Sequence, residues 1–219
     1  LGLLAAYPAS DDGIRGAALI DAGGRIALAT ETPLIGVDLA DRPFVRMALA
    51  GRAVTTDLFI SSPGSGSVPT IGYFAPVLDG ERRVVCVAVL WLRAAALWQA
   101  VKSSNAMAGP GSFAVLLDRE GIRVAHTFSD DIVFRPAGKL DPALVARLVA
   151  ERRFGAKTRA WLEDVRPFPE LFERARAASP DLSVFRGLAP LSGAWSYGIA
   201  RRFETMPWTE RIAFIDRFE

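Results

Sequence analysis

Two stretches of this sequence share one pattern, and that repetition limits the folds open to the chain. The first is LIDAGGRIALAT, from Leu19 to Thr30, and the second is LLDREGIRVAHT, from Leu116 to Thr127. In each, an Asp follows two bulky apolar residues and precedes a Gly by three positions and a Thr by nine, and the copies are 97 residues apart. An Asp that binds its own backbone and a Gly at positive φ form a tight turn, so each stretch predicts a β-hairpin.

The elements expected after each hairpin are also repeated. In the first half, the pattern predicts a helix within DRPFVRMALAG, a loop rich in Ser, Pro and Gly, and two apolar strands joined at Asp79 and Gly80. In the second half, it predicts a helix within DPALVARLVAERRFG, another near Glu170, and three apolar strands with a turn at Ser192 and Gly193. The chain therefore predicts one α+β module written twice, each a mostly antiparallel sheet flanked by helices.

Capping residues predict where the two main helices begin and end. Asp41 is the expected N-cap of the first helix, and Gly51 the expected end. Asp141 is the expected N-cap of the second, with Pro142 at its first position and Gly155 at its end.

Composition predicts the domain boundary. An Ala-rich helix over residues 92–102 is expected to leave the first module, and residues 105–112, rich in Gly, Pro and Ala, follow it. In a chain of 219 residues, the 97-residue offset favours two domains. We therefore expect one domain over residues 1–104, which includes the exit helix, and a second over residues 105–219.

The charge distribution argues against a nucleic-acid partner. Hydrophobic residues make up 51% of the sequence, which is enough for packed cores. The 26 Lys and Arg residues are scattered among 24 Asp and Glu residues, so the net charge is only +2 and no basic run forms. We expect a folded globular chain that does not bind nucleic acid.

The inventory of reactive side chains argues against catalysis. The single histidine, His126, falls within a predicted strand and is expected in the core, so it cannot build a metal cluster or a Cys–His pair. The sequence contains no phosphate-binding loop and no nucleophile elbow, and the acidic pair Asp130 and Asp131 has no evident partner. We expect no enzyme activity in this chain, no metal and no cofactor.

The single cysteine and the longest apolar run bear on the compartment. Cys86 lies inside VVCVAVLWL and is expected to be an inert core residue, compatible with the cytoplasm or the periplasm. This run is about half of the roughly 20 residues that a membrane helix requires, so we expect no membrane span here. The sequence opens on LGLLAAYP without an initiator Met, so we expect it to be a segment of a longer protein.

Several runs of the sequence resemble a known family of bacterial sensors. In the first half, IGVDLADRPFVRMALAGRAVTTDLF, VPTIGYFAPVLD and RRVVCVAVLWLRAAAL resemble the membrane-distal half of a double Cache domain, a tandem PAS-like sensor. In the second half, SFAVLLDREGIRVAH and GIARRFETMPWTERIAF resemble the membrane-proximal half. The long N-terminal helix of the family is missing here.

The resemblance implies a periplasmic, ligand-sensing domain of an inner-membrane receptor. Such a domain is joined to the membrane through flanking helices, which this chain lacks, and it signals to an output domain in the cytoplasm. A sensor histidine kinase of a two-component system is the first expectation for the output, a chemoreceptor the second and a cyclic-dinucleotide enzyme the third. The alternative is a sensor-like domain without a small ligand, which acts through a protein partner or as a homodimer.

The resemblance also implies a ligand pocket in the membrane-distal module. Arg42 occupies the place of the Arg that holds the ligand carboxylate in amino-acid-binding members, and a guanidinium fork suits a carboxylate. Where the family carries Tyr and Asp in the loop, this chain has Phe59 and Ser61, and Trp91 stands in place of an ammonium-binding Asp. The expected ligand-binding residues are Arg42, Phe44, Phe59, Ser61, Tyr73 and Trp91.

These departures from the family pattern predict the class of ligand. A desolvated α-ammonium group needs anionic partners, and the substitutions remove them. We therefore expect a small organic carboxylate rather than an α-amino acid. Structural roles stay open for the same residues: an ion pair for Arg42, core packing for Phe44, Phe59 and Trp91, and either sheet face for Tyr73.

Overall fold

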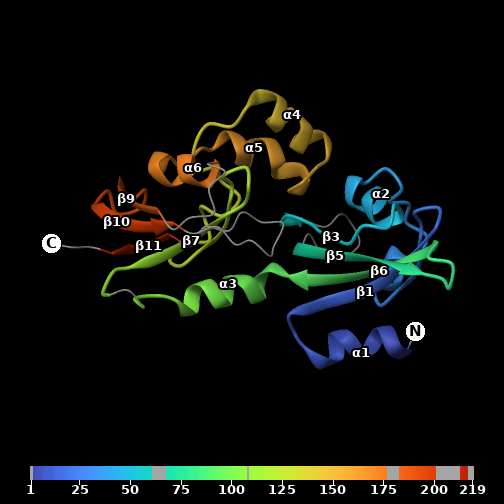
Figure 1. Ribbon diagram of the computed structural model, residues 1–219. Coiled ribbons are helices and arrows are strands. Elements are labelled where there is room, and N and C mark those ends of the chain that lie inside the picture. Colours follow the sequence, from blue (N-terminus) through green and yellow to red (C-terminus); the bar gives the residue numbers. More distant parts are fainter. Residues whose placement is uncertain (1, 61–67, 108, 177–182, 201–212, 217–219) are drawn as a thin grey trace. The chain divides into compact units, whose positions relative to one another are not determined.

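The computed structural model describes the chain except for residues 1, 61–67, 108, 177–182, 201–212 and 217–219 (Figure 1). The chain divides into two compact units, residues 1–96 and residues 97–219. Each unit contains its own antiparallel sheet with helices beside it, so the predicted α+β fold class is confirmed. Among the helices that the structure describes, none combines the length and the apolar character needed to cross a bilayer.

The division between the units falls inside one helix, α3 (Ala94–Ser103). Later residues of α3 are tied to the second unit: Trp98 Nε1 donates to the carbonyl oxygen of Val124 at 2.7 Å, and Lys102 Nζ lies 2.8 Å from a carboxylate oxygen of Asp130. The compact units divide near the N-terminal end of α3, whereas the boundary expected after residue 104 lies past its C-terminal end. That expected boundary stays a prediction.

The first unit consists of a sheet between two helices. Along the chain its elements are α1 (Gly2–Ser10), β1 (Ile14–Asp21), β2 (Ile26–Ala29), η1 (Thr32–Leu34), α2 (Pro43–Leu49), β3 (Val54–Thr55), β4 (Phe59–Ile60), β5 (Pro69–Leu78) and β6 (Val84–Arg93). The strand order is β2-β1-β6-β5-β3, and β4 also pairs with β5. Figure 1 shows α1 and α2 on opposite faces of this sheet.

The second unit repeats this arrangement with more helix. After α3 come β7 (Phe113–Leu117), β8 (Arg123–His126), α4 (Pro142–Ala150), η2 (Gly155–Lys157), α5 (Thr158–Glu163), α6 (Pro169–Arg176), β9 (Ser183–Leu188), β10 (Trp195–Ala200) and β11 (Ala213–Asp216). The strand order is β8-β7-β11-β10-β9. Within this unit, α4, α5 and α6 lie on one side of the sheet (Figure 1).

The two predicted hairpins have the same turn chemistry. Asp21 accepts hydrogen bonds through Oδ1 from the backbone two and four residues later, each at 2.9 Å, and Asp118 does the same. Gly24 and Gly121 adopt φ angles of 86° and 82°, which a side chain would oppose. The repeated pattern is therefore confirmed as a repeated structure.

The helix ends agree only in part with the expected caps. Asp141 is confirmed as an N-cap, because its Oδ1 accepts from the Ala143 amide at 2.7 Å. The expectation for Asp41 is wrong: Arg42 is the N-cap of α2 and is extended, as a residue before proline prefers, without a side-chain capping bond. Helix α4 ends at Ala150 rather than at Gly155, and Arg152 beyond it has a φ angle of 51°.

Substitution of the two turn aspartates should have unequal effects. Asp118 is 1% exposed and also pairs with buried Arg153 at 2.6 Å, whereas Asp21 is half-buried and holds its turn. Asp118→Ala leaves a buried guanidinium without its anion, so urea unfolding should show a loss of about 3–5 kcal/mol. Asp21→Ala should cost about 1–2 kcal/mol. Equal losses would contradict the asymmetry.

Candidate functional site

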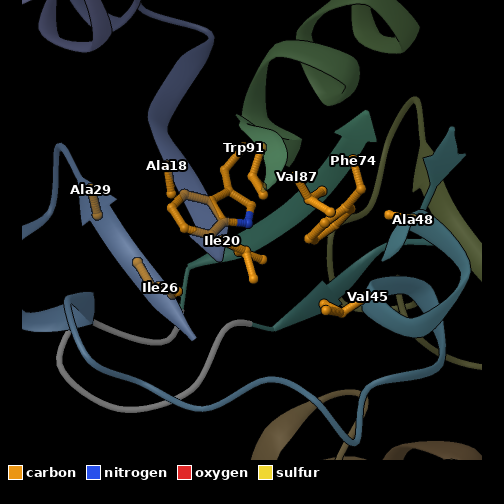
Figure 2. Close-up of a cluster of buried hydrophobic side chains, with 10 residues drawn as sticks. Ala18, Ile20, Ile26, Ala29, Val45, Ala48, Phe74, Val87 and Trp91 are labelled. Carbon is orange, nitrogen blue, oxygen red and sulfur yellow. The ribbon is translucent and has the colours of Figure 1, made fainter. Parts of the chain in front are cut away.

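The face of the first sheet that packs against α2 carries the hydrophobic core of the unit, and we call it the inner face. Figure 2 shows Trp91 beside Ala18 and Ile20, with Phe74 and Val87 farther along the cluster. Because side chains alternate along a strand, Val87 and Trp91 of β6 point inward and Cys86 points to the other face. Cys86 is accordingly half-buried, not the core residue expected from the sequence.

Two glycines stand opposite Trp91 in the neighbouring strands. Trp91 pairs in register with Gly16 of β1 and with Gly72 of β5. A Cβ at Gly16 would lie 2.7 Å from Thr30 Oγ1 and 3.7 Å from the indole, and a Cβ at Gly72 would lie 2.6 Å from the Phe74 ring. The inner face therefore carries no side chain at the two positions directly opposite Trp91.

Aromatic side chains continue this face toward α2. The ring centroids of Phe44 and Phe59 are 6.3 Å apart, and those of Phe44 and Phe74 are 4.7 Å apart. Phe44 and Phe59, both partly buried, pack against the cluster that contains Trp91. The structure thus brings together three of the residues expected at the site, Phe44, Phe59 and Trp91, and we call these three the aromatic wall.

The other three expected residues do not all join them. Arg42 is half-buried at the N-cap of α2, two residues before Phe44. Tyr73 lies between Gly72 and Phe74 on β5, and since Phe74 points inward, Tyr73 faces the opposite side of the sheet from the aromatic wall. Ser61 lies outside the described residues.

A buried arginine beside the aromatic wall was missed by the sequence analysis. The pairing of β1 with β6 shifts register between Ile14 and Gly16, so a bulge contains Arg15, and bulges redirect side chains. Arg15 Nη2 donates to Glu31 Oε2 at 2.9 Å, Nε lies 2.8 Å from Glu31 Oε1, and Nη1 donates to Thr70 Oγ1 at 2.9 Å. We call Arg15, Glu31 and Thr70 the polar cluster.

The polar cluster adjoins the aromatic wall on the inner face. Thr70 shares its side of β5 with Gly72 and Phe74, and its cross-strand partner is Phe59. Glu31 Oε1 would lie 3.4 Å from a Cβ at Gly16, the glycine opposite Trp91. A signal for this cluster was present in the sequence, since Arg15 interrupts the otherwise apolar run IRGAALI.

The electrostatics of the polar cluster are those of a buried ion pair. The side chain of Arg15 is 4% exposed and that of Glu31 is 24% exposed. A guanidinium so far from water is stabilised by an anion and hydrogen-bond acceptors, and Glu31 with Thr70 supplies both. The arrangement can therefore hold a carboxylate against the Arg15 guanidinium next to aromatic rings.

In the second unit, the buried polar residues maintain structure. Arg123, 0% exposed, donates to the backbone carbonyl oxygens of Arg135, Pro136 and Arg166, and burial lowers its pKa to about 10. His126 is 2% exposed, as expected for a core residue, and its Nδ1 accepts from the amides of Phe128 and Ser129. Among the described residues, no group of His, Cys, Asp and Glu side chains is arranged to hold a metal ion.

Burial of His126 makes the stability of the protein depend on pH. Desolvation lowers the His126 pKa from 6.5 to about 4, so the unfolded chain binds a proton in a range where the folded chain does not. Stability should fall as the pH drops from 6.5 toward 4, by about 3 kcal/mol at most from this residue. Urea unfolding at several pH values measures the slope.

A His126→Asn variant is the control, because an amide oxygen can accept from the same two backbone amides without titrating. The difference in stability between wild type and variant should shrink as the pH falls through this range. A constant difference from pH 7 to pH 4 would refute the role of His126.

Comparison with known proteins finds shared fold rather than close relatives. No family model and no curated protein matches the sequence. The sensor domain of the histidine kinase DctB from Vibrio cholerae has a TM-score of 0.69 at 15% identity, over 100% of this chain and 78% of that one. The ligand-binding domain of the Pseudomonas aeruginosa amino-acid chemoreceptor PctC, solved with GABA, has a TM-score of 0.61 at 15% identity, over 96% and 77%.

A third structure agrees with these two. The periplasmic sensory domain of the Campylobacter jejuni chemoreceptor Tlp1 has a TM-score of 0.54 at 14% identity, over 93% of this chain and 70% of that one. The chain therefore has the tandem PAS-like fold of the extracytoplasmic sensor domains of histidine kinases and chemoreceptors, as its resemblance to double Cache domains implied.

Proposed function

We propose that this chain is the periplasmic ligand-sensing domain of a bacterial inner-membrane receptor, and that its first unit binds a small organic carboxylate. The observation that carries this proposal is the gathering of Phe44, Phe59 and Trp91 on the sheet face beside α2, in a fold shared with receptor sensor domains. Arg42, at the start of α2, is the proposed anchor for the carboxylate.

The chemistry of the face supports a carboxylate over an α-amino acid. Aromatic rings suit the apolar part of a small organic acid, and a guanidinium suits its anionic end. An α-ammonium group would need an anionic acceptor after desolvation. Glu31, the carboxylate beside Trp91, is already paired with Arg15 and does not meet that need.

The proposed receptor transmits binding as a shift between two arrangements of the domain. A ligand that prefers one arrangement moves the equilibrium toward it, and flanking membrane helices carry the change to a cytoplasmic output domain. A histidine kinase is the first proposal for that output and a chemoreceptor the second.

Thermal unfolding with a panel of short carboxylates, α-amino acids and their amides tests the proposed function. At 100 times its Kd, a ligand that binds only the folded state adds about 2.7 kcal/mol, which raises the midpoint by several degrees. We expect carboxylates to produce this shift in the wild type and in an Arg52→Ala control, and to lose it in Arg42→Ala. Stabilisation by α-amino acids, or by no member of the panel, would contradict the proposal.

A second candidate function, homodimerisation, is favoured by an exposed face of β9 and β10. Val184, Arg186 and Leu188 pair in register with Ile199, Tyr197 and Trp195. The five apolar and aromatic members are 40–64% exposed, and the Arg186 guanidinium lies 5.0 Å from the Trp195 ring centroid. An apolar strip of this kind, ending on the edge strand β9, suits a two-fold contact with a second copy.

Sedimentation analysis of a Trp195→Ser/Ile199→Ser double variant tests this second candidate. We expect the wild type to dimerise in a concentration-dependent way and the double variant to stay monomeric. Val85→Ser is the matched control, since Val85 is 48% exposed on the sheet of the first unit. A monomeric wild type at all concentrations would exclude dimerisation through this strip.

A further inference from the structure

The Glu31 carboxylate occupies the position that a bound anion would take. Its Oε2 accepts from Arg15 Nη2 at 2.9 Å, and its Oε1 lies 2.8 Å from Arg15 Nε without a hydrogen bond, so the Arg15 guanidinium faces both oxygens of a carboxylate. Neither residue belongs to the set expected from the family resemblance. Their surroundings, Trp91 on one side and Phe59 across from Thr70 on the other, are those of the proposed ligand.

We propose that Glu31 is an internal stand-in for the ligand, and that a small carboxylate binds by displacing Glu31 and taking its place on Arg15. This inference rests on the proposed function, because it assigns a second anchor to the same inner face. The ligand carboxylate would receive the Nε and Nη2 donors of Arg15, and its apolar part would lie against the aromatic wall.

Exchange of one carboxylate for another avoids the main cost of opening a buried ion pair. Removing an anion from a guanidinium that is 4% exposed is costly, but an incoming carboxylate restores the charge balance. Glu31 is the more exposed partner, and Thr32 and Pro33 beyond it are exposed. The displaced side chain can therefore reach water directly.

The second module shows that the hairpin does not need this ion pair. At the 97-residue offset, Ser112 stands at the position of Arg15 and Phe128 at that of Glu31, while Thr127 keeps the role of Thr30. Phe113 replaces Gly16 and packs against His126, with centroids 5.1 Å apart. The same scaffold thus folds without Arg15 and Glu31, so the pair in the first module is open to another role.

Displacement of Glu31 would also act on the segment that leads to Arg42. The Glu31 carbonyl oxygen accepts from the Leu34 amide at 3.0 Å in the turn that opens η1, and the chain then runs to the N-cap of α2. Release of the Glu31 side chain removes one contact between the start of this segment and β1, while Thr30 stays hydrogen-bonded to Ala17. Ligand binding would in this way change the restraint on the segment from Glu31 to Arg42.

The experiment compares acetate and succinate binding to wild type, Glu31→Gln and Glu81→Gln by calorimetry, with sodium chloride holding the ionic strength constant. Glu31→Gln removes the internal competitor and keeps its size, so we expect its Kd for these anions to be at least about tenfold lower than that of wild type. Glu81→Gln, which removes a carboxylate 72% exposed, should match wild type. Adding Arg15→Lys to Glu31→Gln should abolish the gain, because lysine lacks the planar fork.

Circular dichroism establishes that each variant is folded, and Glu31→Asp replaces Glu31→Gln if the latter is not. The shorter Asp should hold Arg15 less well and give a smaller gain in anion affinity. An affinity in these variants no higher than in wild type overturns the inference. If wild type binds carboxylates and the Arg42→Ala variant does not, the proposed function stands without this inference. If no carboxylate binds wild type or any variant, the proposed function and this inference both fail.

Discussion

Two positions without side chains, one on each strand beside Trp91, shape the inner face of the first sheet. The positions opposite the indole in both neighbouring strands are Gly16 and Gly72, where a side chain would meet Thr30 and the Phe74 ring respectively. The bulge before Gly16 then admits Arg15 to the same region, and Glu31 follows because a buried guanidinium needs an anion. The polar cluster and the aromatic wall therefore adjoin each other at Gly16, which lies between Glu31 and Trp91.

The two modules show how one scaffold accepts different contents. In both, an Asp carboxylate accepts from backbone amides of the turn and a Thr hydroxyl accepts from an amide of the opposite strand. In the second module this Asp, Asp118, also forms an ion pair with Arg153, and Phe113 stands at the position of Gly16. The charged pair of the second module is buried on both sides, whereas Glu31, the anion of the pair in the first module, is 24% exposed.

Local patterns in the sequence were enough to predict the modules, but not the site. The Asp, Gly and Thr spacing identified both hairpins because turn chemistry depends on neighbouring residues alone. The grouping of Phe44, Phe59 and Trp91 also followed, since it depended on family resemblance and apolar pattern. Tyr73 faces away because side-chain direction depends on register, and Arg15 was missed because a bulge arises from pairing between strands. Asp41 is not the cap of α2 because Pro43 favours an extended conformation at Arg42, which therefore takes the N-cap position.

The pairing of Arg15 with a carboxylate from its own chain has a consequence for sensitivity. A tethered group acts at a fixed local concentration, which for short flexible connections is on the order of millimolar. A free acid competing with such a group is registered when its own concentration becomes comparable, whatever the intrinsic strength of the contact. In the proposed receptor, the detection threshold would then depend on the length and stiffness of the loop that carries Glu31, and could be changed there while the residues that touch the ligand stay unchanged.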